Sequence, residues 1–313
     1  MPELRGGEYL TRRGVVILCL FLCTHYGCND QGKATPQKPL PVPEITIGLL
    51  PERNIFHQVE RYQPLAAYLS VKTGVTIRLK VLPGYGDIIN NIVSSGVDGS
   101  FFGSFTYVLA HAKLGVEVLA RPESLDGIST YHGLIFVRKD SGIKTVKDMK
   151  GKRFAFVDKG TTAGYLLPVE YFKTRGINNY RSYLKEVYFA GTHEDAIYDV
   201  LNRKADIGAA KNTVFQRLAV SDSRINDELM ILGKSPDVPE NGLAVRKDLN
   251  SALKDSIKQR LLDMHRDPAG QKVLKQFGAR KFIETRDEDY GPVYKYTQEI
   301  DLDLRTFDYM NGK

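Results

Sequence analysis

The sequence predicts an α/β protein with two doubly wound α/β lobes that are joined by a hinge of two crossovers. Strand-like and helix-like segments alternate from residue 45 to residue 113, and the same order returns 108 residues further on. Such alternation is typical of βαβ units and a parallel sheet. The chain continues beyond the second lobe, so we expect it to cross between the lobes near residues 131–134 and again near 236–242. Two crossovers make a hinge, and hinge closure around a ligand is a recurrent mechanism.

The first lobe is predicted from the period of its apolar residues. Val75, Ile77 and Leu79 alternate as in a strand, whereas Ile88, Ile89 and Ile92 follow the spacing of a helix. Read in this way, the segments are a strand at 45–50, a helix that contains 65–69 and ends at Gly74, a strand at 75–81, a helix at 88–93, a strand at 97–102 and a helix at 104–113.

An internal repeat predicts the second lobe. A shift of 108 residues, without a gap from residue 45 to residue 107, places Asp98 on Asp206 and Ser104 on Asn212. It also places the strand at 45–50 on residues 153–158. We therefore expect two similar lobes that follow one another.

The remaining segments complete the lobes and the return of the chain. They are a loop at 121–130, strands at 131–138, 154–157, 229–233 and 242–246, a loop at 235–241, and helices at 165–175, 249–266, 269–277 and 298–309. We expect the last segments to cover the first lobe. The predicted first lobe is therefore 44–131 together with 240–313, and the second is 132–239.

Composition and charge narrow the class of ligand. The chain has 313 residues, of which 42% are hydrophobic and 26% charged, so it has room for a large core and, by length, two domains. Its formal net charge of +7 suits an anionic ligand or an anionic membrane surface. No block of Lys and Arg is dense enough to indicate a nucleic-acid partner.

The N-terminus has the pattern of a targeting segment. Three arginines precede the apolar run at 15–22, which is too short to span a bilayer, and residues 1–28 are therefore predicted to be a lipoprotein-type signal peptide. Gly27 and Cys28 resemble the processing site of bacterial lipoproteins, with Cys28 acylated. The Pro-rich residues 29–43 then form a flexible tether. The alternative is simple cleavage and release. All three cysteines lie in this segment, which excludes disulfides and thiolate metal sites from the rest of the chain.

Residues 154–168 predict an anion site. A short apolar strand is followed by Asp158, Lys159 and a glycine, then by Thr161, Thr162 and a helix. The first N–H groups of a helix lack internal partners, and its dipole favours negative charge. The alternative is that Thr162 is only an N-cap. We expect Lys159 to face solvent.

Polar and aromatic side chains also follow the other predicted strands. In open α/β sheets, ligands lie beyond the carboxyl ends of the strands. The repeat pairs Asn54 with Thr162 and Tyr85 with His193, so six loops meet in one cleft if the lobes face each other. We expect Asn212 to donate from the second lobe, and Tyr85, Ser104 and Asn54 to close from the first. His57, His111 and His132 have no second ligand at metal-binding spacing.

These residues resemble a known family. Residues 137–143, 148–158, 164–168, 191–194, 235–236 and 245–249 resemble the phosphate/phosphite/phosphonate substrate-binding proteins of ABC transporters, over roughly residues 45–285. The resemblance implies the type 2 periplasmic-binding-protein fold. It also implies an extracytoplasmic, lipid-anchored monomer that captures a small oxyanion and delivers it to an ABC permease in the inner membrane.

The resemblance also implies roles for single residues. The family's Ser-Thr-Ser segment falls on Thr161, Thr162 and Ala163, and its ligand-contacting histidine falls on His193. A site aromatic falls on Phe102 and the hinge tyrosine falls on Tyr131. Asn241 and Thr213 stand at or near positions where some members have acids that bind a ligand ammonium, which argues against an aminoalkyl phosphonate. The predicted ligand-binding residues are therefore Thr161, Thr162, Ala163, His193, Tyr85, Phe102, Ser104, Asn212, Tyr131, Asn241 and Asn54.

Two other functions were weighed. A periplasmic sensor domain that binds a different small ligand for a signalling partner remains open. An enzyme is not expected, because the chain has no Gly-x-Ser-x-Gly or His-Glu-x-x-His motif, no cysteine beyond residue 28, and a predicted cleft with one histidine and few acids. We predict no cofactor and no metal site.

Overall fold

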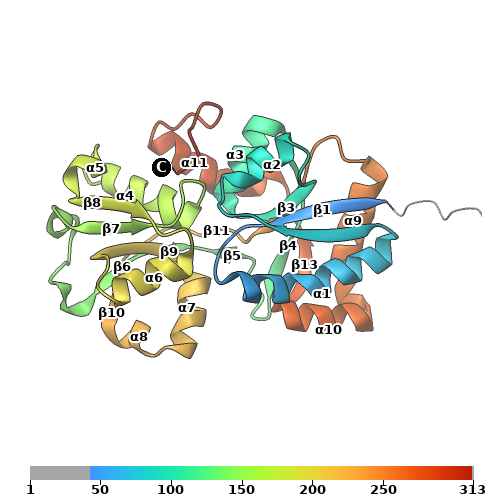
Figure 1. The fold of residues 1–313 in the computed structure, drawn as a ribbon, viewed down its shortest axis with the longest axis horizontal. Coiled ribbons are helices and arrows are strands. Elements are labelled where there is room, and N and C mark those ends of the chain that lie inside the picture. Colours follow the sequence, from blue (N-terminus) through green and yellow to red (C-terminus); the bar gives the residue numbers. More distant parts are fainter. Residues whose placement is uncertain (1–42, 312–313) are drawn as a thin grey trace, which may run out of the picture. The chain divides into compact units, whose positions relative to one another are not determined.

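The computed structural model describes residues 43–311. The predicted signal peptide, Cys28 and nearly all of the predicted tether lie outside the described residues. Two mixed sheets form the cores of two lobes, which confirms the predicted fold class (Figure 1). Among the described residues, no helix is both long enough and apolar enough to cross a membrane.

The first lobe holds a six-stranded sheet. Its strand order is β13-β4-β12-β3-β1-β2, in which β1, β2 and β3 run parallel and β12 pairs antiparallel with both β3 and β4. The strands are β1 (Glu44–Leu49), β2 (Thr76–Val81), β3 (Gly99–Phe102), β4 (Glu117–Ser124), β12 (Gly242–Val245) and β13 (Ala279–Glu284). The helices of this lobe are α1 (Ile55–Thr73), α2 (Asp87–Val93), α3 (Ser104–Leu114), α9 (Ser251–Asp263), α10 (Pro268–Phe277) and α11 (Gly291–Glu299), with short turns η4 (Met264–Arg266) and η5 (Asp287–Tyr290).

The second lobe holds a five-stranded sheet with the order β10-β6-β9-β7-β8. Its strands are β6 (Gly133–Arg138), β7 (Arg153–Phe156), β8 (Glu186–Phe189), β9 (Ile207–Lys211) and β10 (Leu229–Lys234). Its helices are α4 (Leu167–Lys173), α5 (Tyr180–Tyr183), α6 (His193–Leu201), α7 (Asn212–Ser221) and α8 (Arg224–Glu228), with turns η1 (Lys139–Ser141), η2 (Val146–Met149) and the π-helical η3 (Thr162–Leu166).

The two crossovers pair with each other. β5 (Thr130–Tyr131) and β11 (Val238–Pro239) form a two-stranded antiparallel ribbon between the main sheets. The predicted lobe limits, after residues 131 and 239, coincide with the ends of these strands and stay a prediction. A single buried apolar cluster continues from the second lobe onto the α2–α3 side of the first sheet, whereas α1, α9 and α10 cover a separate cluster.

Several sequence expectations are wrong in detail. Residues 121–130 are not simply a loop, because β4 extends to Ser124, and β13 was not predicted. The strand expected at 131–138 is two strands, β5 and β6, and the helix expected at 165–175 begins as η3 and ends at Lys173. The repeat also needs a one-residue gap. The backbone N–H of Thr46 in β1 donates to the Asp98 carboxylate, and the N–H of Arg153 in β7 donates to the Asp206 carboxylate in the same way. Thr46 therefore corresponds to Arg153. Asn54 then corresponds to Thr161, and each of the two is the N-cap of the helix that follows its strand.

The predicted last helix at 298–309 is also wrong. Helix α11 ends at Glu299, and residues 300–311, here called the C-terminal strap, lie against both lobes beside α11 (Figure 1). The Phe307 ring lies 5.8 Å from that of Phe105 in the first lobe and 6.1 Å from that of Tyr165 in the second. Lys159 is mostly buried and pairs with Asp308 at 2.9 Å, so the expectation that it faces solvent is also wrong.

The strap predicts a measurable stabilisation. Phe307→Ala removes a ring that packs on both lobes, and we expect a loss of about 1–2 kcal/mol in the free energy of unfolding. Thermal unfolding of the variant measures this loss. Arg305→Ala is the matched control, because Arg305 contacts Lys113 through its backbone oxygen only. Equal melting temperatures for Phe307→Ala and wild type would contradict a stabilising strap.

Candidate functional site

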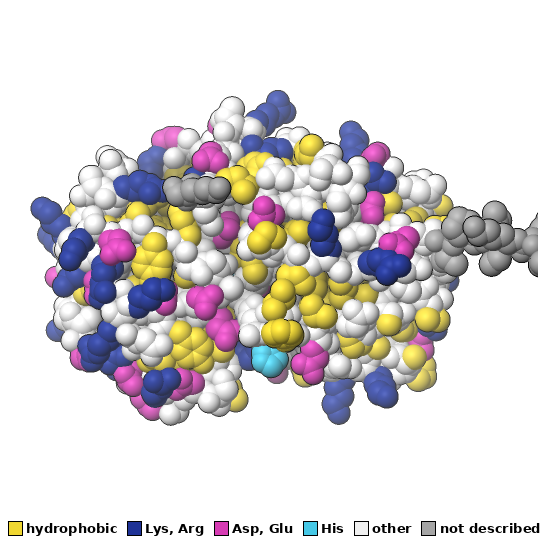
Figure 2. All heavy atoms as spheres, viewed as in Figure 1, with side chains coloured by type: hydrophobic (Ala, Val, Ile, Leu, Met, Phe, Trp, Pro, Cys, Tyr) yellow, Lys and Arg dark blue, Asp and Glu magenta, His cyan; other side chains and the backbone are white. Residues whose placement is uncertain are grey.

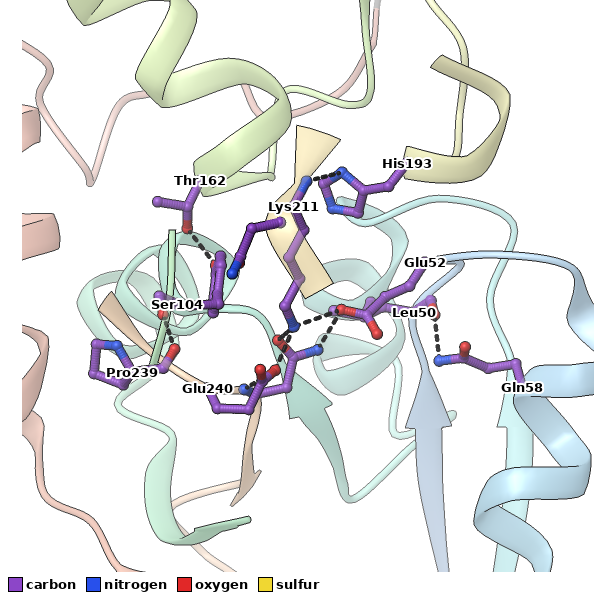
Figure 3. Close-up of polar contacts among 12 residues, drawn as sticks. Leu50, Glu52, Gln58, Ser104, Thr162, His193, Lys211, Pro239 and Glu240 are labelled. Carbon is purple, nitrogen blue, oxygen red and sulfur yellow. Dashed lines mark hydrogen bonds and ion pairs between the residues drawn. The ribbon is translucent and has the colours of Figure 1, made fainter. Parts of the chain in front are cut away.

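The carboxyl ends of strands from both sheets meet in one cleft, as expected (Figure 3). Three hydrogen bonds join the lobes there. The Phe105 N–H donates to Thr162 Oγ1 at 2.9 Å, Thr106 Oγ1 donates to the Gly160 carbonyl at 2.7 Å, and the Tyr85 N–H donates to an Asp158 carboxylate oxygen at 3.3 Å. The cleft is therefore in a closed arrangement.

The turn after β7 is built as a donor site. Thr161 is the N-cap of η3, but its hydroxyl donates to the Asp158 carbonyl at 2.7 Å instead of capping the helix. The N–H groups of Thr162, Ala163 and Gly164 donate to no acceptor among residues 43–311. Unpaired N–H groups at a helix start are suited to bind an anion.

Thr162 has one hydrogen-bond donor left to use. Its Oγ1 accepts from the Phe105 N–H and from the Tyr131 hydroxyl, the latter at 3.0 Å. A hydroxyl has two acceptor positions and one donor. Because both acceptor positions are filled, the Thr162 proton is available to an acceptor such as an anion oxygen.

His193 and Tyr85 add two further donors. His193 Nδ1 accepts from the Lys211 N–H at 3.3 Å, which leaves the proton of the neutral imidazole on Nε2. Burial lowers the pKa of His193 to about 4, although the Glu52 carboxylate opposes this shift. The Tyr85 ring lies edge-on to His193 at 6.2 Å, and its buried hydroxyl has no hydrogen-bond partner. The Tyr85 hydroxyl is therefore able to donate a hydrogen bond to a bound ligand.

A buried ammonium closes the other side of the cleft. Lys211 Nζ lies 3.2 Å from Glu52 Oε1 and 3.0 Å from Asn241 Oδ1, contacts Glu240, and stands 4.3 Å from the centre of the Tyr131 ring. Asn241 Nδ2 in turn donates to Glu52 Oε1 at 2.9 Å. The ammonium is thus shared by two carboxylates, an amide and an aromatic face.

The charges of this cluster hold each other ionised. Burial alone would raise the pKa of Glu52, but the Lys211 ammonium, with His193 and Arg61, lowers it to about 2. Burial alone would lower the pKa of Lys211, but Glu240 and Glu52 raise it above its ordinary value. A buried ion pair that is also hydrogen-bonded tolerates desolvation, whereas one that loses a partner does not.

The structure brings some predicted residues together and places others elsewhere. Thr161, Thr162, Ala163, Tyr85, Tyr131, His193 and Asn241 surround the closed cleft. Ser104 is buried nearby, but its hydroxyl donates to the Pro239 carbonyl at 2.6 Å. Phe102 is wholly buried at the end of β3. Asn212 Oδ1 accepts from the His132 N–H, and the exposed Asn54 caps α1, so neither side-chain oxygen faces the cleft.

Sequence reasoning missed the acids. The cleft was expected to hold few carboxylates, yet Glu52, Glu240 and Asp158 all line it. The signal available was the repeat, which placed the loops of Glu52 and Lys211 at strand ends of opposite lobes. Within the described part of the chain, no group of three or more His, Cys, Asp or Glu is arranged to hold a metal ion.

A cavity of about 380 Å³ opens beside this cluster. Glu52, Lys211, Asn212 and Glu240 line its inner end. The arrangement offers donors to an anion on the Thr162 side and a neutralised charge cluster on the Lys211 side, and it therefore suits binding of a small polar ligand.

Comparisons with known proteins identify the family of the chain. The profile of a family described as ABC transporter, phosphonate, periplasmic substrate-binding protein matches residues 47–290. The chain is 25% identical over 253 residues to the phosphonates-binding periplasmic protein of Escherichia coli K12, a match that spans 80% of this chain and 74% of that protein. It is 26% identical over 242 residues to the phosphate-import protein PhnD of Mycolicibacterium smegmatis, which spans 74% of each.

A solved structure shows the same fold. The binding protein component of a phosphonate ABC transporter from Pseudomonas aeruginosa matches with a TM-score of 0.76 at 22% identity, over 83% of this chain and 87% of that one. The chain therefore belongs to the phosphonate-binding periplasmic protein family of ABC transporters, and it is a substrate-binding protein with a type 2 periplasmic-binding-protein fold rather than an enzyme.

Proposed function

We propose that this protein captures an amine-free phosphorus oxyanion, such as phosphite, phosphate or a simple phosphonate, between its lobes and presents it to an inner-membrane permease. The observation that carries the proposal is the position of Lys211. Its ammonium already occupies the space between Glu52, Glu240 and Asn241. A ligand amine therefore has no free carboxylate to bind in that part of the cleft.

The donors on the opposite side supply the anion contacts. The Thr162 hydroxyl, the N–H groups at the start of η3, the His193 Nε2–H and the Tyr85 hydroxyl are the groups that we assign to the ligand oxygens. Hydrogen bonds from such donors to a charged oxygen are shorter and stronger than neutral ones. The names of two relatives, a phosphonates-binding protein and a phosphate-import protein, support this ligand class.

A melting-temperature screen tests the proposal. Residues 30–313 would be heated with phosphate, phosphite, methylphosphonate, 2-aminoethylphosphonate, sulfate or taurine. A ligand at about 100 times its dissociation constant stabilises by about 2.7 kcal/mol. We expect a shift with at least one amine-free phosphorus oxyanion. Tight binding of 2-aminoethylphosphonate, without binding of phosphate, phosphite or methylphosphonate, would contradict the proposal.

Thr162→Ala should weaken binding of the ligand found in this screen. If the hydroxyl meets a charged oxygen, its loss costs about 1.5–3 kcal/mol of affinity. Titration calorimetry measures the loss, and Thr162→Ser, which keeps the hydroxyl, is the matched control. Thr162→Ala with wild-type affinity would mean that this hydroxyl serves only the lobe contacts of Phe105 and Tyr131.

We also propose that acylation of Cys28 anchors the mature protein to the membrane and that residues 29–43 act as the tether. Fractionation of cells that express Cys28→Ser tests this. Release of the variant into the soluble fraction is expected. Equal distribution of variant and wild type would favour simple cleavage.

A further inference from the structure

Three arginines meet at the rim of the cleft, outside the site described above. Arg53 follows β1, Arg61 lies on α1, and Arg217 lies on α7 of the second lobe. All three line one cavity of about 290 Å³, together with His57, Glu60 and the C-terminal end of α10. Positive charge from both lobes therefore faces the same space.

No carboxylate lies within ion-pair distance of these three guanidinium groups in the part of the chain that the structure describes. Arg53 donates to the His57 carbonyl at 3.3 Å. Arg61 donates to the Phe277 carbonyl at 2.8 Å and stacks on the Phe277 ring at 4.3 Å. The acid that lines the cavity, Glu60, lies 3.7 Å from His57 instead.

The positive charges of the three arginines repel one another. Burial first, and then Arg217 and Arg61, lower the pKa of Arg53. Arg217 is exposed at the rim; partial desolvation of its guanidinium first, and then Arg61, lower its pKa, while Glu52 and Glu240 oppose the shift. Like charges held close together cost free energy, and a bound anion removes that cost.

The rim cavity is connected to the cleft by shared walls. Arg61, Arg217 and Gly278 also line the cavity of about 380 Å³ that reaches Lys211. Arg61 and Arg217 therefore border both cavities, so an anion at the rim would lie next to the space that Lys211 lines. The face of the molecule drawn in Figure 2 carries Lys and Arg mixed with Asp and Glu and shows no broad patch of positive charge.

We propose that Arg53, Arg61 and Arg217 form a second anion site that takes a phosphate group. The group is either free inorganic phosphate or the distal phosphate of an oligophosphate whose other end lies in the cleft. Guanidinium groups match phosphate oxygens in pairs. Since the arginines come from both lobes, a bound phosphate bridges the lobes and favours the closed arrangement. As a site for free phosphate it is independent of the proposed function, whereas the oligophosphate alternative rests on anion binding in the cleft.

Titration calorimetry with inorganic phosphate, diphosphate and tripolyphosphate, in an amine buffer, tests the site. The main variant is Arg217→Ala, because Arg217 donates no hydrogen bond within residues 43–311 and its loss should not disturb folding. Arg53→Ala is the second variant. Arg181→Ala is the charge-matched control, since Arg181 is exposed on α5 and lines neither cavity. Thr162→Ala reports on the cleft.

We expect Arg217→Ala and Arg53→Ala to weaken binding of at least one probe about tenfold, the value of one charged hydrogen bond. For a free phosphate site, Thr162→Ala binds that probe as wild type does. For a spanning oligophosphate, Thr162→Ala weakens it too. The proposal is overturned if Arg217→Ala binds all three probes as wild type does, or if Arg181→Ala weakens them equally. Failure of the cleft proposal would appear separately, as wild-type binding of every anion by Thr162→Ala.

Discussion

Replacing Lys211 by methionine should destabilise the protein more than any other single substitution in the cleft. The change removes the ammonium but leaves Glu52 and Glu240 close together, Glu52 fully buried. Removing one partner of a buried ion pair typically costs about 3–5 kcal/mol, because the remaining charge is desolvated without compensation. Each kcal/mol lowers the melting temperature of a protein of this size by about 2–4 °C. Thermal unfolding at pH 7.5 measures the effect.

A second substitution identifies the cause of that loss. Lys211→Met combined with Glu52→Gln removes a charge from each side of the cluster, and we expect it to recover part of the melting temperature. Lys144→Met is the control for the substitution itself, because the Lys144 side chain is exposed. If Lys211→Met melts with the wild type, or if the double variant is no better, the cluster does not stabilise the closed cleft.

The same variant tests the ligand assignment. In Lys211→Met the ammonium is absent, so Glu52, Glu240 and Asn241 become available to a ligand amine. We expect 2-aminoethylphosphonate to raise the melting temperature of this variant but not that of the wild type. Stabilisation of both proteins to the same extent would mean that Lys211 does not exclude amine-bearing ligands.

The sequence was sufficient for the architecture but not for its irregular parts. Period-2 and period-3.6 patterns predicted β1, β2 and β3 of the first sheet, and the internal repeat carried the same order over to the second lobe. Strand β4 was missed; it contains Pro122, and a proline within a run argues against a strand. The C-terminal strap was predicted as a helix, yet Phe307 packs against both lobes in an irregular segment. Tertiary contacts decided the conformation there.

Only the part of the candidate site that lies in one local sequence motif was predicted. Thr161 and Thr162 lie in a recognisable strand-turn-helix, so their position in the cleft followed from the sequence. Lys211, Glu52 and Glu240 are separated by 159 and 29 residues and meet only through the fold. No local pattern connects them, and lysines are mostly exposed unless they are paired, so the burial of Lys211 could not be predicted. The internal repeat was the single clue, because it placed the loops of Glu52 and Lys211 at strand ends of opposite lobes; Glu240 lies outside the repeat.

Acidification should destabilise the protein in two successive steps. Burial lowers the pKa of His193 from 6.5 to about 4. Between these two pH values the unfolded chain therefore binds a proton at this histidine and the folded protein does not. Stability is then complete above pH 6.5 and falls as the pH drops toward 4, by about 3 kcal/mol in total. The pKa of Glu52, about 2 against an ordinary 4.5, adds a second loss as the pH falls from 4.5 toward 2.

Melting temperatures between pH 7.5 and pH 3, in buffers without phosphate, separate the two steps. His193→Gln should abolish the slope between pH 6.5 and pH 4 while keeping the steeper fall below pH 4.5, because Glu52 and Lys211 are intact in this variant. Glu52→Gln should do the reverse, from a lower starting stability. An identical slope above pH 4.5 in wild type and His193→Gln would contradict a neutral, buried His193. A charged imidazolium would also be unable to accept the Lys211 N–H, which is the contact that fixes the neutral tautomer of His193.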